Sequence, residues 1–152
     1  MRLAIAAFFA VVASVALQAQ PVSLDLSAAT PIAGSWTYAT VAGGSEATFA
    51  NPSAMPQLRV RCTRATRRVA IAKPATGAAP FLAIWTDTSV RSVPASFNPQ
   101  TARLTADLPA FDPLLDALAF SRGRIGVTVT GVPALVVPAF PEVARVIEDC
   151  RS

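Results

Sequence analysis

Two cysteines, Cys62 and Cys150, are the only thiols in this chain of 152 residues. Cys62 ends the segment 57–62, in which apolar and charged residues alternate as in a strand with one buried face. Cys150 ends a stripe of apolar residues within 143–150, spaced i, i+3, i+4 and i+7 as on one face of a helix. Both patterns turn the thiol toward the core, so we expect one intramolecular disulfide between Cys62 and Cys150.

Five arginines within ten residues form the densest charged group in the chain. They are Arg59, Arg61, Arg64, Arg67 and Arg68. Guanidinium groups bind carboxylates and phosphates through paired hydrogen bonds, so the group is a candidate contact for an anionic ligand or an envelope protein. The alternative is a solvated strand face whose charges prevent edge-to-edge pairing. No aromatic residue is interleaved with these arginines, which disfavours a nucleic-acid partner.

The chain contains no histidine. This absence removes the commonest general base, the usual partner of a nucleophilic serine, and the commonest metal ligand. Asp107, Asp112 and Asp116 lie close in sequence, but a strand end, a helix cap and a helix surface explain them better than a shared site. We therefore expect no catalytic residues, no metal and no cofactor.

The first 19 residues have the order of a secretory signal peptide. Arg2 supplies a basic start, residues 3–17 form an apolar run, and a polar, small-residue segment follows. That run, and every later one, is shorter than the roughly 20 apolar residues of a membrane-spanning helix. We expect a signal peptide at 1–19, a flexible arm at 20–33, and one domain at 34–152 in a periplasmic or secreted protein, where the two thiols can be oxidised.

Short alternating or apolar segments, separated by glycine and proline, predict a mainly β domain. We expect about seven or eight strands, drawn from 36–41, 46–50, 57–62, 68–73, 81–85, 89–93, 102–108, 124–130 and 134–137. Asp112 and Pro113 predict the start of a short inserted helix, with Gly123 as its C-terminal stop. A second helix is expected from Pro141 to the C-terminus. The fold class expected from this order is an antiparallel β-sandwich with both helices.

The order of elements in the second half of the chain carries a resemblance. A strand RLTADL, a segment LLDAL, a strand RIGVTV, a strand PALVVP and a helix FPEVARVIEDC follow one another. This arrangement, with the cysteine-bearing strand LRVRC, resembles small Gram-negative periplasmic β-sandwich proteins of the type VI secretion-associated periplasmic family and the invasion-associated locus B family. The resemblance covers residues 34–150 as an arrangement of elements. It implies a periplasmic β-sandwich and assigns no catalytic residue.

These observations favour an exported, non-catalytic binding or accessory protein of the cell envelope. One alternative is a small periplasmic hydrolase that acts on an anionic substrate. Another is a purely structural envelope component. The arrangement of the arginine side chains discriminates among them, because convergence in a hollow favours ligand binding and dispersal on a flat face favours a structural or protein-contact role. The oligomeric state is left open by the sequence.

Overall fold

A computed structural model describes residues 25–152, so the predicted signal peptide and the first residues of the predicted arm lie outside the described part. The elements are β1 (Ser35–Val41), β2 (Gly44–Ala50), β3 (Pro56–Thr63), the 3-10 turn Arg64–Thr66, β4 (Arg68–Pro74), β5 (Phe81–Trp85), β6 (Val90–Asn98), β7 (Arg103–Pro109), α1 (Pro113–Phe120), β8 (Arg124–Thr128), β9 (Leu135–Pro138) and α2 (Pro141–Asp149). Among these elements, neither helix is long and apolar enough to cross a membrane.

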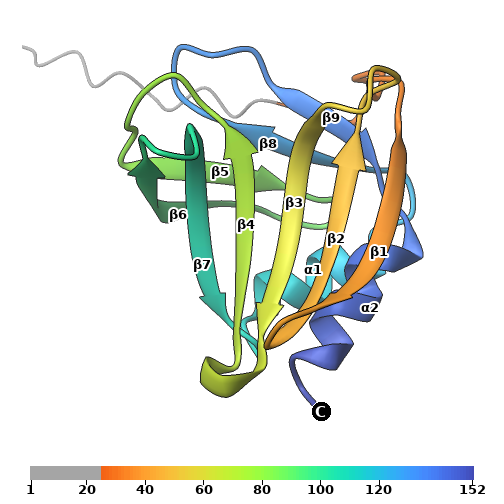
Figure 1. Cartoon of the computed structure of the whole chain (residues 1–152). Helices are drawn as coiled ribbons and strands as arrows, with labels where there is room; N and C mark the ends of the chain where they lie inside the picture. Colours follow the sequence, from red (N-terminus) through yellow and green to blue (C-terminus); the bar gives the residue numbers. More distant parts are fainter. Residues whose placement is uncertain (1–24) are drawn as a thin grey trace, which may run out of the picture.

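All nine strands of residues 25–152 belong to one antiparallel sheet, in the order β1-β2-β3-β4-β7-β6-β5-β8-β9 (Figure 1). The prediction of a mainly β, antiparallel domain with one inserted and one C-terminal helix is confirmed. Two separate facing sheets are not confirmed, because β6 connects both halves. Its first part, Val90–Pro94, pairs with β5, and its second part, Ala95–Asn98, pairs with β7. The sheet bends at this strand, so that β5 and β8 cross behind β3 and β4 (Figure 1).

The two edge strands of the bent sheet come close to each other. Trp36 of β1 donates from its indole Nε1 to the carbonyl oxygen of Pro138 of β9, at 2.8 Å. Just before β1, the backbone N–H of Ile32 donates to the carbonyl of Val136, at 2.9 Å. These two hydrogen bonds join the ends of the sheet, and the core fills the space that the curved sheet encloses.

The hairpin of β3 and β4 forms as its alternation predicts. Val60 pairs with Ile71 and Cys62 with Val69, and all four side chains are buried. A tight turn joins β1 to β2 through two residues only. Gly43 in this turn has φ 76°, a left-handed conformation that glycine adopts without a steric cost.

Helix α1 begins as the sequence predicts and ends differently. The Asp112 carboxylate accepts from the backbone N–H of Leu114 at 2.8 Å, and Pro113 occupies the first helical position. The prediction that Gly123 stops the helix is wrong, because α1 already ends at Phe120 and Gly123 has no left-handed conformation. The Asp87 carboxylate instead accepts from the N–H groups of Arg122 and Gly123, at 2.6 and 3.2 Å.

Residues 25–33, the described part of the predicted arm, lie along β8 and β9. Leu26 is buried, and its Cδ1 occupies the place that a side chain on Gly126 would need, since a Cβ there would lie 2.1 Å away. The Arg124 guanidinium donates to the carbonyl oxygen of Ala29. The expectation of a flexible arm did not include these contacts, because a single buried leucine produces no periodic pattern.

We expect Leu26→Ala to lower the free energy of unfolding by about 2 kcal/mol, since the change leaves a cavity above Gly126. Ile32 is a matched control, because it lies in the same segment and is exposed. Ile32→Ala should leave the urea midpoint unchanged. Equal midpoints for Leu26→Ala and the wild type would show that the arm contributes nothing to stability.

Candidate functional site

Three of the five predicted contact arginines are engaged by carboxylates of neighbouring strands. Arg59 Nε lies 3.1 Å from Glu46 Oε1, and Arg61 Nη1 lies 3.7 Å from Glu46 Oε2. Arg68 forms an ion pair with Asp107 of β7. The arginines of β3 and β4 therefore lie beside acidic partners on the neighbouring strands β2 and β7. The outer face of the sheet carries both signs of charge, which weakens its attraction for a diffusing anion.

The other two arginines lie on the turn between β3 and β4. Arg64 and Arg67 are exposed, and within residues 25–152 neither forms an ion pair. Arg67 has φ 49°, a left-handed conformation at the end of the 3-10 turn. The five arginines are thus divided between a paired strand face and a solvent-exposed turn, and they do not converge on one point.

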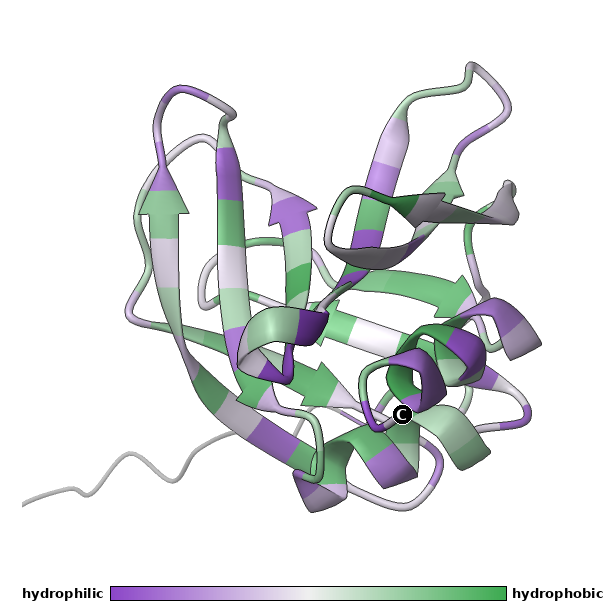
Figure 2. Cartoon of the chain, turned by 60° about the horizontal axis from the view of Figure 1, so that its bottom comes forward, coloured by the Kyte–Doolittle hydropathy of each residue, from purple (hydrophilic) through white to green (hydrophobic). Residues whose placement is uncertain are grey.

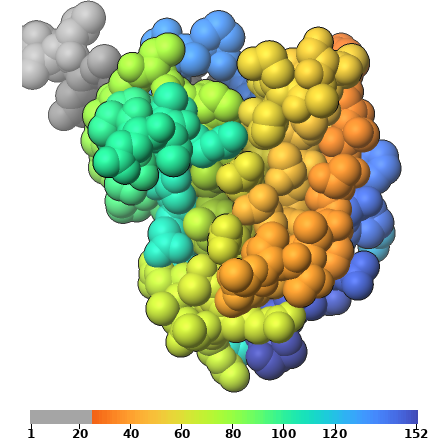
Figure 3. Space-filling view, in the orientation of Figure 1, coloured from red at the N-terminus to blue at the C-terminus, as the bar shows by residue number. Residues whose placement is uncertain are grey.

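A shallow hollow runs over β4 on the same outer face (Figure 3). The outward residues of this strand, Ala70 and Ala72, are small, whereas the flanking strands carry longer side chains. One of these longer side chains is Arg103 of β7, which is not among the five arginines predicted as contacts from the sequence. Burial, with a smaller contribution from the nearby charge of Arg59, lowers the pKa of the Arg103 guanidinium. This outer face is a candidate for an anion contact, although a weaker one than the cavity described below.

The three aspartates considered for chemistry do not form a shared site. Asp107 pairs with Arg68, Asp112 lies 2.6 Å from Arg91, and Asp116 lies 2.8 Å from Arg151. Each carboxylate is thus held by an arginine of a different element. Among the residues that the structure describes, no group of three or more potential ligands could hold a metal ion.

Lys73 is the one buried basic residue of the described core. It is the only lysine of the chain, and only 8% of its surface is exposed. Its Nζ donates to the carbonyl oxygen of Pro74 at 3.2 Å. Within residues 25–152 it has no carboxylate partner. Burial lowers the pKa of the Lys73 amine, because the charged form is poorly solvated there.

A cavity of about 430 Å³ lies against Lys73. Its walls are the β4–β5 connection, the β6–β7 turn and the β8–β9 connection, which meet at the end of the sheet opposite the two helices (Figure 1). The lining is mostly small and apolar, with two threonine hydroxyls. It consists of Lys73, Pro74, Ala75, Thr76, Gly77, Ala78, Ala79, Ala102, Val129, Thr130 and Val132. Lys73 is the only charged member of this set.

The two helices cover the opposite end of the molecule (Figure 2). Helices α1 and α2 pack together across it, and Figure 2 looks onto this end. The buried residues Leu114, Leu115 and Leu118 of α1 contribute to the same core as the apolar stripe of α2. The helices thus cover the core at one end, and the loops around Lys73 lie at the other end.

One wall of the cavity is held in a strained conformation. Ala102 has φ 48°, which costs a residue with a Cβ roughly 1–2 kcal/mol. Its carbonyl oxygen accepts from the backbone N–H of Ala75 at 3.0 Å, so it connects two of the loops that line the cavity. Such strain is concentrated at sites where the surrounding structure fixes a geometry.

Comparisons with models of known protein families, with curated proteins and with solved structures found no match to this chain. The resemblance to the two periplasmic families therefore stays a prediction.

Sequence reasoning missed Lys73, although the signal was present. The alternation that places Val69 and Ile71 inward also places Lys73 inward, since residues at i, i+2 and i+4 of a strand share one face. A lone lysine in the apolar phase of a strand is unusual, because lysine is almost never fully buried without a partner. The cavity itself could not be found in this way, because three connections far apart in sequence form it.

Proposed function

We propose that this chain is an exported, non-catalytic binding protein of the periplasm or the extracellular space, and that its ligand site is the cavity at Lys73. The observation that carries this proposal is a nine-tenths buried lysine, without a carboxylate partner in the described residues, in the wall of an otherwise uncharged cavity. The volume of about 430 Å³ is within the range of roughly 300–1,000 Å³ typical of small-molecule sites.

Two further observations support the proposal over its alternatives. The chain has no histidine, and the candidate aspartates Asp107, Asp112 and Asp116 are each paired with an arginine, so neither residue type offers an unpaired general base for a hydrolase. A disulfide is present, which is consistent with an oxidising compartment outside the cytoplasm. A purely structural role would not explain a cavity with a charged group in its wall.

The test uses an uncharged fluorescent probe, N-phenyl-1-naphthylamine, so that it reports on the cavity and not on charge. We expect saturable binding to the wild type. Ala78 lies in the cavity wall and is exposed, so Ala78→Trp should fill the cavity without disturbing the core. We expect this variant to weaken probe binding by about tenfold or more, which corresponds to roughly 1.4 kcal/mol.

The matched control is the double change Arg64→Gln and Arg67→Gln, which alters the exposed turn and leaves the ion pairs of the strand face in place. It should bind the probe like the wild type. Absence of saturable binding to the wild type, or binding that the arginine changes weaken and Ala78→Trp does not, would contradict the assignment of the site.

A further inference from the structure

We infer that the ligand of the Lys73 cavity is a compact, apolar molecule with a single carboxylate, and that the Lys73 ammonium supplies its counter-charge. This inference rests on the proposed function, since it names the class of molecule that the same cavity takes. It follows from three properties of the site: an incompletely bonded ammonium, a single charge, and an apolar wall.

The ammonium of Lys73 is incompletely hydrogen-bonded within the described residues. A lysine ammonium carries three N–H donors, and the structure shows one hydrogen bond from Nζ, to the carbonyl oxygen of Pro74. Only 8% of the residue is exposed, so bulk water replaces the missing partners poorly. A buried cation without a counter-charge is unfavourable, and a carboxylate placed in the adjacent cavity would accept the remaining hydrogen bonds.

The charge of the site fits a monoanion. Among residues 25–152, Lys73 is the only charged residue that lines the cavity, and the arginines of the strand face are not part of the lining. A phosphate monoester carries close to two negative charges at neutral pH, and recognition of phosphate usually involves arginine forks, backbone N–H clusters or several basic groups. One ammonium surrounded by alanine, valine and proline matches one carboxylate attached to an apolar body. The hydroxyls of Thr76 and Thr130 are the remaining polar side chains of the lining.

A ligand-binding role and a structural role for Lys73 predict opposite effects of its replacement on stability. Burial lowers the pKa of the amine in the folded protein below its ordinary value in the unfolded chain. The folded state therefore holds this proton less tightly, and stability rises as the pH increases from the folded pKa toward the ordinary value. Below this range the cation lowers stability. Lys73→Met should consequently unfold at the same or a higher temperature than the wild type at pH 7. If Lys73 had a structural role, the variant would instead unfold at a lower temperature.

The experiment compares octanoate with octanamide by isothermal titration calorimetry, because the two probes have the same apolar body and differ in charge. We expect the wild type to bind octanoate about tenfold or more tightly than octanamide, because hydrogen bonds between charged groups are stronger than those to a neutral amide. Lys73→Met should lose this preference and still bind octanamide. Lys73→Arg, which keeps the charge, should retain part of it. The control with Arg64→Gln and Arg67→Gln should retain all of it.

A second measurement does not depend on any variant. Because Lys73 is the only lysine, protein labelled with [13Cε]lysine gives a single lysine signal by NMR. Octanoate should shift this signal and raise the pKa read from its titration, whereas octanamide, which carries no charge, should not raise that pKa. An octanoate complex in which the lysine pKa does not move would overturn the inference.

The outcomes separate this inference from the proposed function. If the uncharged probe binds the wild type and Ala78→Trp blocks it, but octanoate and octanamide bind equally, the cavity is a ligand site and the carboxylate inference is wrong. If Lys73→Met keeps the full preference for octanoate, the inference is also wrong. If neither the uncharged fluorescent probe nor octanoate binds in the cavity, both proposals fail.

Discussion

Replacing both cysteines by serine, Cys62→Ser with Cys150→Ser, is expected to lower the free energy of unfolding by about 4–5 kcal/mol. The disulfide joins residues 88 positions apart in sequence, with a Cα–Cα distance of 5.4 Å. Cross-linking so long a loop removes much of the conformational freedom of the unfolded chain. An effect of this size is a large part of the total stability of a small domain, commonly about 5–15 kcal/mol.

The measurement is a urea unfolding curve of the double variant beside the oxidised and the reduced wild type. The reduced wild type is the matched control, because it loses the cross-link and keeps the sequence. We expect it to unfold at nearly the midpoint of the double variant. Two free thiols in the unreduced wild type, or equal midpoints for the double variant and the oxidised protein, would contradict the prediction.

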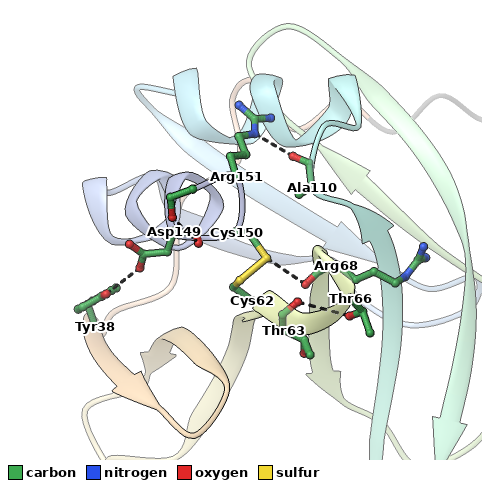
Figure 4. Close-up of a disulfide and its surroundings, with 10 residues drawn as sticks. Tyr38, Cys62, Thr63, Thr66, Arg68, Ala110, Asp149, Cys150 and Arg151 are labelled. Carbon is green, nitrogen blue, oxygen red and sulfur yellow. Dashed lines mark hydrogen bonds between the residues drawn. A yellow bond between two sulfur atoms is a disulfide. The ribbon is translucent and has the colours of Figure 1, made fainter.

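The disulfide also fixes the end of α2 against the sheet (Figure 4). Beside it, the Tyr38 hydroxyl of β1 donates to Asp149 Oδ2 at 2.7 Å. On the other side, Arg151 donates from Nε to the carbonyl oxygen of Ala110 at 2.8 Å. The C-terminal end of the helix is therefore held by a covalent bond and by polar contacts to β1 and to the connection between β7 and α1.

The second large effect is expected from Ile147→Asp in α2. Val143, Val146 and Ile147 are buried and belong to the core. Truncation of such a side chain to alanine costs about 2–5 kcal/mol, and an aspartate adds the cost of a buried carboxylate without a partner. We expect Ile147→Ala to lower the free energy of unfolding within that range, and Ile147→Asp to lower it further.

Glu148→Ala is the matched control for α2, because Glu148 is the next residue of the helix and is exposed. Its urea midpoint should lie close to that of the wild type. If Ile147→Asp unfolded at the wild-type midpoint as well, the apolar face of the helix would not be docked on the sheet, and the disulfide and the polar contacts would hold the C-terminus.

The sequence by itself determined the local elements and the covalent cross-link. Alternation in 57–62 and 68–73 predicted the β3–β4 hairpin, and Asp112 with Pro113 predicted the start of α1. The apolar stripe of 143–150 predicted α2 and, with the strand pattern, turned both Cys62 and Cys150 inward. These features were predictable because a strand or helix displays its buried face in the spacing of residues close together in the chain.

Only the tertiary structure decided how the strands are combined and which charges meet. Alternation gives the same pattern for one bent sheet as for two facing sheets, and the pairing of β6 with both β5 and β7 selects the former. The pairs of Glu46 with Arg59 and of Asp107 with Arg68 depend on strand register, so the arginine cluster looked more positive in sequence than it is on the sheet. The cavity at Lys73 depends on three connections separated by tens of residues, and no local spacing records where such segments meet.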